Sequence, residues 1–406
     1  MKKVAVDKHL YLLKGFTQHY DWGGDSFIPS VTLESSNGLP MAEYWLGAHS
    51  SAPSVILPDN VPLNELLASH PSKYLQQSAE TFSTLPFLLK LLDVKKMLSI
   101  QVHPSKETAR RKYAEENAKG IALNSSSRNY KDENHKPELM VAMSEFWLLH
   151  GFKPETQLLQ VLKTIPEFAV FIDTFDQNNY KKLYTEIMQM PQDRVNTILH
   201  PLLSRIIPLY HSERLKKESE DFWAARAALT FNKGEDIDRG IFSIYLFNLV
   251  RLEKGQAVFQ DAGVPHAYLE GWNVEIMANS DNVLRGGLTP KHIDVNELLE
   301  NVKCEATHPV IINGEKRGEE IVFVTPVNDF ELSYIETKQE TSLSLNPASP
   351  TIFLLIKGKC VINSGDTRIS LAAGSPSAIA FPGSGVMIET ELDALIFKAS
   401  VPIHRQ

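Results

Sequence analysis

Cysteine is nearly absent from this chain: only Cys304 and Cys360 occur among its 406 residues, and they lie far apart. Two isolated cysteines exclude both a disulfide framework and a zinc site built from cysteine. Basic residues are in the minority, with 41 Lys and Arg against 49 Asp and Glu, which gives a net charge of −8. This balance argues against a protein that coats nucleic acid, although a local basic pocket for a phosphate stays open.

Long apolar runs are missing as well. The N-terminus carries Asp7 and Lys8 where a signal peptide needs an apolar segment, and the run Leu85–Leu92 is interrupted by Pro86 and Lys90. We therefore expect no secretion signal and no transmembrane helix, and we expect a cytoplasmic enzyme. A hydrophobic content of 43% is typical of a globular protein, and the length allows two or three domains.

Most of the chain shows the short apolar segments of β-strands, but one region does not. Between residues 154 and 233 apolar side chains recur at helical spacing, which predicts a helical insertion of about 80 residues. Strands are expected to resume at Gly240, with Ile241–Leu252 as the first. After residue 310 many short strands predict a barrel or jelly roll. A further helix is predicted over Ser105–Gly120, which ends in glycine.

One predicted strand carries polar side chains on a single face. Ser99, Gln101 and His103 alternate with apolar residues, and Pro104 ends the run. Alternate residues of a strand point to the same side, and burying three polar side chains is costly unless something binds them. A metal ion or a polar ligand would satisfy them. A solvated strand face, or a hydrogen-bonded histidine in the core, is the alternative.

Two later segments add candidate metal ligands. Glu138 opens an apolar strand, and His266 follows a Gly-Val-Pro turn. Together with Gln101 and His103 they form a set of two imidazoles, one carboxylate and one amide, which suits a borderline divalent ion such as zinc. Spacing alone leaves open the alternative that these are scattered core and surface residues.

Several longer motifs occur in an order that resembles the type I phosphomannose isomerase family. They are His19-Tyr-Asp-Trp-Gly, Glu43-Tyr-Trp-Leu-Gly-Ala-His49, Ser99-Ile-Gln-Val-His-Pro104, His135-Lys-Pro-Glu138, Pro265-His-Ala-Tyr-Leu269, Glu275-Ile-Met-Ala-Asn-Ser-Asp-Asn-Val-Leu-Arg285 and Gly287-Leu-Thr-Pro-Lys291. The resemblance covers roughly residues 18–295, and the helical insertion and the last hundred residues match only in outline.

The resemblance implies a mainly β fold with a helical insertion. A zinc-binding cupin (jelly-roll) catalytic domain would comprise residues 1–153 and 236–320, an α-helical domain residues 154–235, and a second, C-terminal cupin-like β domain residues 321–406. It also implies one zinc ion per chain and a set of site residues. The implied zinc ligands are Gln101, His103, Glu138 and His266; the implied catalytic arginine is Arg285; and the implied pocket-lining residues are Lys90, Ser99, Lys136 and Glu275.

The implied reaction interconverts mannose 6-phosphate and fructose 6-phosphate by moving a proton between C1 and C2 through an enediol. Arg285 would stabilise the developing negative charge, because a guanidinium stays charged and presents several donors. Lys136 and Glu275 are both candidates for the base. Lys136 would first have to lose its own proton, whereas Glu275 needs no such change but is able instead to hold Arg285.

Other residues are candidates for supporting steps. His135 and Asp281 are candidates for opening the sugar ring by acid–base catalysis, with hydrogen-bonded loop residues as the alternative. Lys90 stands inside an apolar run, where it either extends its charged end to solvent or meets an anion. Lys90 and Ser99 are therefore candidate contacts for the phosphate or for sugar hydroxyls.

We expect a monomer whose partner is a small sugar phosphate, with no nucleic acid and no membrane. Two rival functions stay open. An iron cupin dioxygenase is one, since two histidines and a carboxylate also suit non-haem iron, and a non-catalytic sugar-phosphate-binding cupin is the other. The pathway also stays open between mannose catabolism and the supply of mannose, through GDP-mannose, for glycan synthesis.

Overall fold

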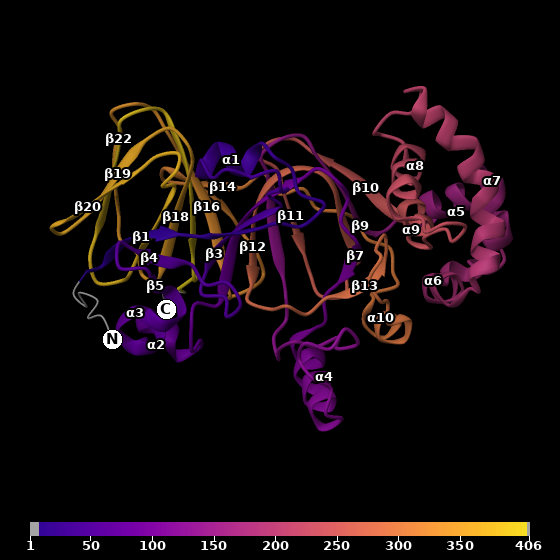
Figure 1. Cartoon of the computed structure of the whole chain (residues 1–406), viewed down its shortest axis with the longest axis horizontal. Coiled ribbons are helices and arrows are strands. Elements are labelled where there is room, and N and C mark those ends of the chain that lie inside the picture. The colour runs from indigo at the N-terminus through magenta and orange to yellow at the C-terminus, as the bar shows by residue number, and fades with distance from the viewer. Residues whose placement is uncertain (1–7, 404–406) are drawn as a thin grey trace.

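The computed structural model describes residues 8–403 and arranges them as three regions in a row. Figure 1 shows a group of C-terminal strands at one end, a set of sheets in the centre, and most of the helices at the other end. The mainly β fold with a helical insertion, expected from the sequence, is confirmed.

The central region is a 10-stranded sheet in which β12 is the hub. The first part of β12 pairs with β7 and β9, and its second part pairs with β6 and β8, always antiparallel. Because β12 joins four neighbours, its side chains lie next to those of most of the sheet. The strands are β2 (Phe16–Gln18), β3 (Glu43–Gly47), β6 (Phe87–Val94), β7 (Ile100–Val102), β8 (Glu138–Ala142), β9 (Phe146–Phe152), β10 (Phe247–Leu252), β11 (Ala257–Gln260), β12 (His266–Ala278) and β13 (Leu284–Gly287).

The C-terminal region contains a 9-stranded and a 4-stranded sheet. The larger is ordered β14-β15-β16-β23-β18-β21-β1-β4-β5 and the smaller β17-β22-β19-β20. The larger sheet combines strands from the N-terminal and the C-terminal part of the chain. The sheets therefore do not by themselves define the domain boundaries that the resemblance implies, and these boundaries stay a prediction. The strands are β1 (Leu10–Lys14), β4 (Val55–Leu57), β5 (Val61–Pro62), β14 (Glu315–Arg317), β15 (Glu320–Phe323), β16 (Glu331–Thr337), β17 (Ser342–Leu345), β18 (Thr351–Lys357), β19 (Cys360–Ser364), β20 (Thr367–Leu371), β21 (Ser377–Ala380), β22 (Val386–Thr390) and β23 (Ala394–Ser400).

The predicted helical insertion is present and extends further than expected. Its elements are α5 (Glu155–Thr164), η2 (Pro166–Phe171), η3 (Asp176–Asn178), α6 (Tyr180–Gln189), α7 (Gln192–His211), α8 (Glu220–Phe231) and α9 (Gly240–Leu246). The strand predicted from Ile241 is wrong for its first half, which is α9. Every residue of α9 is buried, and Phe242 packs against Phe168 and Phe171. A run buried on all sides has no periodicity that separates helix from strand.

The remaining helices lie around the two β regions. They are α1 (Phe27–Thr32), α2 (Leu63–Ser69), α3 (Pro71–Leu75), η1 (Gln76–Glu80), α4 (Lys106–Ala118) and α10 (Val295–Asn301). The helix predicted over Ser105–Gly120 is confirmed as α4, and the Ser105 hydroxyl accepts a hydrogen bond from the Thr108 N–H at its start.

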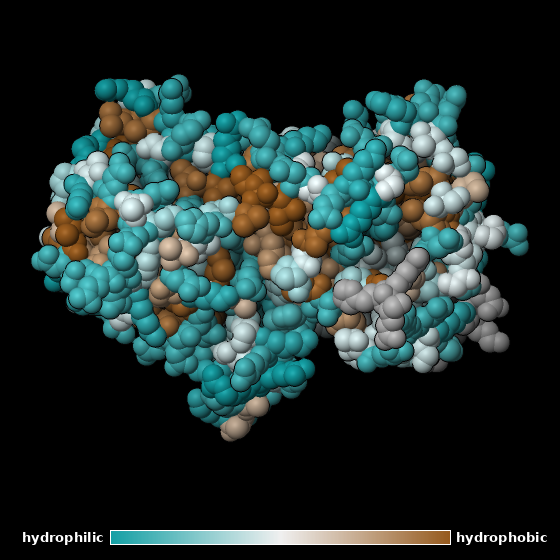
Figure 2. All heavy atoms as spheres, turned by 180° about the vertical axis from the view of Figure 1, so that it is seen from behind, coloured by the Kyte–Doolittle hydropathy of each residue, from teal (hydrophilic) through white to brown (hydrophobic). Residues whose placement is uncertain are grey.

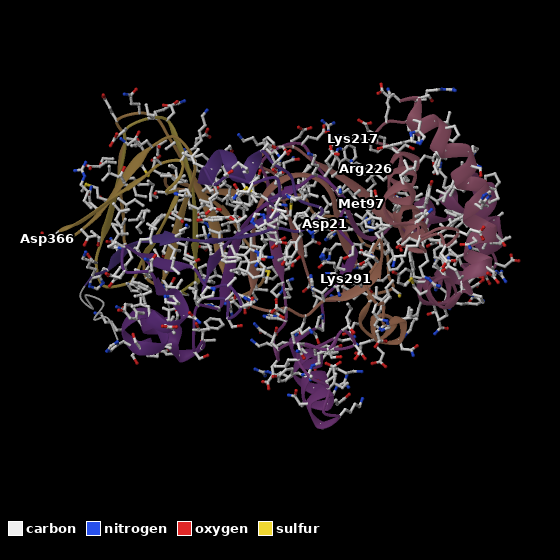
Figure 3. All side chains as sticks on the ribbon, in the orientation of Figure 1. Asp21, Met97, Lys217, Arg226, Lys291 and Asp366 are labelled. Atoms are coloured by element: carbon white, nitrogen blue, oxygen red, sulfur yellow. The ribbon has the colours of Figure 1, made fainter. Side chains whose placement is uncertain are left out.

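Charged contacts tie the helical region to β12. Lys217 and Arg226 both donate to the Glu270 carboxylate, and Arg226 also donates to the Lys95 carbonyl. Figure 3 shows Lys217 and Arg226 close together at the junction of the helices with the central sheet. None of the described helices has the length and apolar character that a membrane crossing requires. From behind, the surface is mostly hydrophilic, with apolar side chains gathered over the middle (Figure 2).

Candidate metal centre

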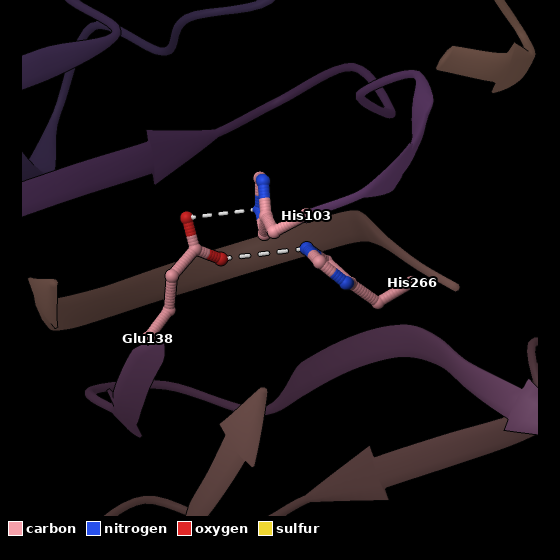
Figure 4. A group of neighbouring side chains, drawn as sticks. All are labelled: His103, Glu138 and His266. Carbon is pink, nitrogen blue, oxygen red and sulfur yellow. Dashed lines mark ion pairs between the residues drawn. The ribbon is translucent and has the colours of Figure 1, made fainter. Parts of the chain in front are cut away.

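Three of the predicted ligands meet at one point. His103 follows β7, Glu138 opens β8 and His266 opens β12, and their ligand atoms all lie within 4.8 Å of one another. Nε2 of His103 is 3.3 Å from Oε1 of Glu138, and Nε2 of His266 is 3.4 Å from Oε2 (Figure 4). Within residues 8–403 this is the group of histidine, cysteine and carboxylate side chains that could hold a metal ion. The three segments are far apart in sequence, and pairing with β12 brings them together.

Hydrogen bonds to main-chain carbonyls fix both imidazoles. Nδ1 of His103 donates to the Asn282 carbonyl at 2.9 Å, and Nδ1 of His266 donates to the Val264 carbonyl at 3.0 Å. A carbonyl only accepts, so Nδ1 carries the proton in each ring and Nε2 of the neutral ring carries a lone pair. Metal-binding histidines are oriented in this way in many proteins.

The charges at this point call for a cation. Burial lowers the pKa of the His103 imidazole to about 4, which keeps the ring neutral at pH 7. Burial alone would raise the pKa of the Glu138 carboxyl, but His103 and Lys136 outweigh it and hold that pKa well below the usual range. Nε2 of His103 is buried without a hydrogen-bond partner among the described residues. In their neutral forms the two imidazoles direct Nε2 lone pairs towards the carboxylate, and a set of two imidazoles and one carboxylate fits zinc.

Gln101, the fourth predicted ligand, lies beside this group. In β7 it is directly opposite His266 of β12 on one side and Arg285 of β13 on the other. Residues opposite one another in antiparallel strands point to the same face. Gln101, His266 and Arg285 therefore form a row across three strands, and Gln101 lines the same pocket as Glu138 and His266.

The pocket holds about 360 Å³ of empty space, part of it open to solvent, and its lining is strongly charged. Lys90, which is 5% exposed, lies 3.1 Å from Glu275 and 3.5 Å from Glu43. The Tyr268 hydroxyl donates to Glu275 at 2.7 Å, and the Trp45 indole donates to Glu43 at 2.5 Å. Lys90 thus meets two carboxylates of the protein and does not extend to solvent.

Burial and these neighbours shift the pKa values in the pocket. Burial would lower the pKa of Lys90, but Glu43 and Glu275 raise it above its ordinary value. The pKa of Glu275 is raised, chiefly by burial, although the charge of Lys90 opposes the rise. One ammonium therefore lies between two carboxylates, and Glu275 has a higher proton affinity than an ordinary glutamate.

The other predicted site residues are placed around this pocket. Lys136 lines it, with Nζ 3.5 Å from Oε1 of Glu138. Ser99 directly precedes β7 and is partly exposed. Asp281, half exposed, forms an ion pair with Nε2 of His49 at 3.4 Å. His135 points elsewhere, and its Nε2 lies 3.1 Å from both oxygens of Asp329 in the C-terminal region.

Arg285 has a cationic neighbour that spacing did not single out. Burial lowers the pKa of Arg285, and both burial and the charge of Arg285 lower the pKa of Lys291. Figure 3 shows Lys291 beside β13. Among the described residues no carboxylate forms an ion pair with either cation. In the sequence, Lys291 stood out only as part of the Gly287-Leu-Thr-Pro-Lys291 motif. That motif contributed to the family resemblance but assigned no role to the lysine.

Comparison with known proteins gives the chain its relatives. Residues 10–155 match the family model for the phosphomannose isomerase type I catalytic domain. The mannose-6-phosphate isomerase of Escherichia coli (strain K12) is 35% identical over 384 residues, which span 92% of this chain and 95% of that protein.

Solved structures match over nearly the whole length. Mannose 6-phosphate isomerase from Salmonella typhimurium, bound to fructose 6-phosphate and zinc, superposes with a TM-score of 0.86 at 30% identity and covers 98% of this chain and 100% of that chain. A mannose 6-phosphate isomerase bound with zinc and yttrium has a TM-score of 0.86 at 31% identity, with the same coverage.

We expect His103→Ala and His266→Ala each to lower bound zinc from about one ion per chain to nearly none, because each variant keeps a single imidazole and one carboxylate, with only the neutral Gln101 amide beside them. Elemental analysis of the purified, dialysed proteins measures this. His135→Ala is the matched control and should keep its zinc, since His135 contacts Asp329 and not the three ligands. Full zinc content in either of the first two variants would show that the ligand set is wrong.

Proposed function

The chain belongs to the type I phosphomannose isomerase family, and from this premise we propose that it interconverts mannose 6-phosphate and fructose 6-phosphate as a zinc-dependent aldose–ketose isomerase. The convergence of His103, Glu138 and His266 carries the proposal, together with the pocket that Glu138 and His266 share with Lys90 and Glu275. Family membership favours this function over an iron dioxygenase and over a non-catalytic sugar-phosphate-binding protein.

The zinc site would be formed by His103, Glu138 and His266, with the neutral oxygen of Gln101 as a fourth ligand. Bound zinc supplies a Lewis acid that polarises substrate oxygens. With a single carboxylate among its ligands, the site keeps a net positive charge, which favours oxygen atoms that become negative during the reaction.

We assign the proton transfer between C1 and C2 to Glu275. Its raised pKa brings its proton affinity closer to neutral pH, where a general base is most effective. Lys90 and Tyr268 hold its two oxygens in place. Lys136 is the alternative base, but its Nζ lies 3.5 Å from Oε1 of Glu138, and a lysine must lose a proton before it acts as a base.

Arg285 and Lys291 are proposed to bind the negative charges of the substrate. Arg285 is partly buried, Lys291 is exposed, and neither forms an ion pair with a carboxylate of the described chain, which leaves their charges for a ligand. Arg285 stands in the row with Gln101 and His266, so it is assigned to the charge that develops on the enediolate. Lys291, further from that row, is assigned to the phosphate, and Lys90 and Ser99 to the sugar hydroxyls.

Asp281 and His135 stay the proposed groups for ring opening. The Ser51 N–H donates to Nδ1 of His49, so the proton of the neutral ring is on Nε2, which faces Asp281. The hydrogen bond from His49 is the main cause that lowers the pKa of Asp281 and keeps this carboxylate ionised and able to accept a proton. His135 would act through its other nitrogen, because Nε2 is held by Asp329.

We further propose that the enzyme is a cytoplasmic monomer that links mannose 6-phosphate to hexose metabolism in either direction, including the supply of GDP-mannose. Light scattering after size exclusion measures the oligomeric state, and a mass twice the 45.6 kDa of the chain would exclude the monomer.

We expect purified protein to convert mannose 6-phosphate to fructose 6-phosphate, and a strong chelator to abolish this activity until zinc is added back. An assay coupled to glucose-6-phosphate isomerase and glucose-6-phosphate dehydrogenase measures the rate at which fructose 6-phosphate forms. Oxygen uptake in the presence of iron would select the dioxygenase instead. Binding of mannose 6-phosphate by the zinc-loaded protein without turnover would select the non-catalytic function.

We expect Arg285→Ala to lower kcat by roughly 100- to 1,000-fold, because it removes stabilisation of charge that exists only in the transition state. Lys291→Met should raise KM about tenfold and leave kcat nearly unchanged, because it removes binding that substrate and transition state share. Lys303→Met, which breaks an exposed pair with Asp261, is the control and should change neither value. Equal loss of kcat in the two site variants would contradict the separate roles.

We expect kcat/KM to fall with decreasing pH as Glu275 gains its proton, at a pH above the usual carboxyl range because its pKa is raised. The charge of Lys90 lowers that pKa, so Lys90→Met should move the fall to higher pH by roughly one to three pH units. Glu275→Gln should lose activity by roughly 100- to 10,000-fold. An unchanged pH profile in Lys90→Met, or near-normal turnover in Glu275→Gln, would leave Lys136 as the base.

A further inference from the structure

A fully buried glutamine lies beside Glu138 of the candidate metal centre. Gln260 is the last residue of β11, is 0% exposed, and is opposite Glu138 in the antiparallel pair of β11 and β8. Opposite residues in such a pair point to the same face with their Cβ atoms about 5 Å apart. The Gln260 amide therefore lies beside the Glu138 side chain, although Gln260 does not line the pocket itself.

The Gln260 amide has no hydrogen-bond partner. Neither Nε2 nor Oε1 finds one among the described residues of the chain. The polar group that interacts with the amide is the Tyr268 hydroxyl: burial raises its pKa, and Gln260 opposes the rise through a side-chain hydrogen bond too weak to meet normal hydrogen-bond geometry. A buried amide without a partner is costly, and an apolar side chain of similar size would avoid the cost. Its presence next to a predicted metal ligand therefore points to a partner that becomes available when metal is bound.

We propose that Gln260 is a positioning residue of the metal centre, whose Nε2 donates a hydrogen bond to the Glu138 carboxylate once a cation occupies the site. The inference rests on the proposed zinc site. With a cation among the three ligands, the imidazole nitrogens turn their lone pairs to the ion, and the Glu138 oxygen that does not bind it needs a donor. Metal-binding carboxylates are commonly held by such a second hydrogen bond.

The proposal has a consequence for the metal-free protein. Without zinc the amide is unpaired and destabilises the fold, whereas with zinc it is satisfied. Replacing it by an apolar residue should therefore act in opposite directions on the two states. A purely structural role for Gln260 would instead make both the metal-free fold and zinc binding weaker.

Asn273 provides a matched control. It lies in β12, is 0% exposed, and its two amide atoms also lack partners among the described residues. Its neighbours across the sheet are Leu92 and Ala142, and neither is a predicted metal ligand. Asn273→Leu therefore removes an equally buried amide without touching Glu138.

The experiment measures zinc affinity by competition with a chromophoric chelator, and the melting temperature of the metal-free proteins. Gln260→Leu and Gln260→Met should both bind zinc roughly ten- to hundredfold more weakly than the unchanged protein, while their metal-free melting temperatures rise. Asn273→Leu should raise the metal-free melting temperature and leave zinc affinity unchanged. Two glutamine variants are used so that poor packing of one side chain does not decide the result.

Three results would overturn the proposal. One is zinc affinity within about twofold of the unchanged protein in both glutamine variants, against the ten- to hundredfold expected. Another is a melting temperature that falls together with zinc affinity in both variants, which identifies a structural role. The last is an equal loss of zinc affinity in Asn273→Leu. If the unchanged protein itself binds no zinc, the proposed metal centre fails first, and the two failures are distinguishable.

Discussion

The structure depends on the placement of two imidazole nitrogens and one carboxylate against one another at strands of the central 10-stranded sheet. Main-chain carbonyls hold Nδ1 of His103 and of His266, so both lone pairs face Glu138. Such an arrangement is unfavourable without a cation and strongly favourable with one. The strands that carry these residues all pair with β12 or with its neighbours, so the ladder of hydrogen bonds, and not a flexible loop, sets the distances between the ligands.

The central sheet keeps this geometry because it is packed from two sides. Ala267 and Leu269, at the start of β12, belong to the core shared with the helical region. Val274 and Ile276, further along the same strand, belong to the core shared with the C-terminal sheet. Glu275 lies between these two and points the other way, into the pocket. Alternation along a single strand thus separates the apolar packing from the charged site, and both neighbouring regions contribute to the rigidity of the site.

The sequence was informative where local pattern decides structure. Helical spacing located the insertion that contains α5 to α8, and proline after His103 marked the end of a strand. It failed for Gly240–Leu246, where packing against the aromatic residues of the insertion decides in favour of a helix. It also could not place His135 against Asp329, or His49 against Asp281, because these contacts join segments that are distant in the chain. The convergence of the metal ligands came from the family resemblance, since spacing left scattered residues equally open.

The cations at the site explain how a chain with a net charge of −8 binds an anion. Glu43 and Glu275 balance the charge of Lys90. Lys90 therefore holds these two carboxylates in place and adds little net positive charge to the pocket. Within residues 8–403, Arg285 and Lys291 have no such partners; burial lowers the pKa of each, and the charge of Arg285 lowers that of Lys291 further. A sugar phosphate supplies the missing negative charge. In the proposed function, substrate binding would relieve an electrostatic cost of the free protein, with Lys291 attracting the phosphate and Arg285 meeting the oxygens where the enediolate charge develops.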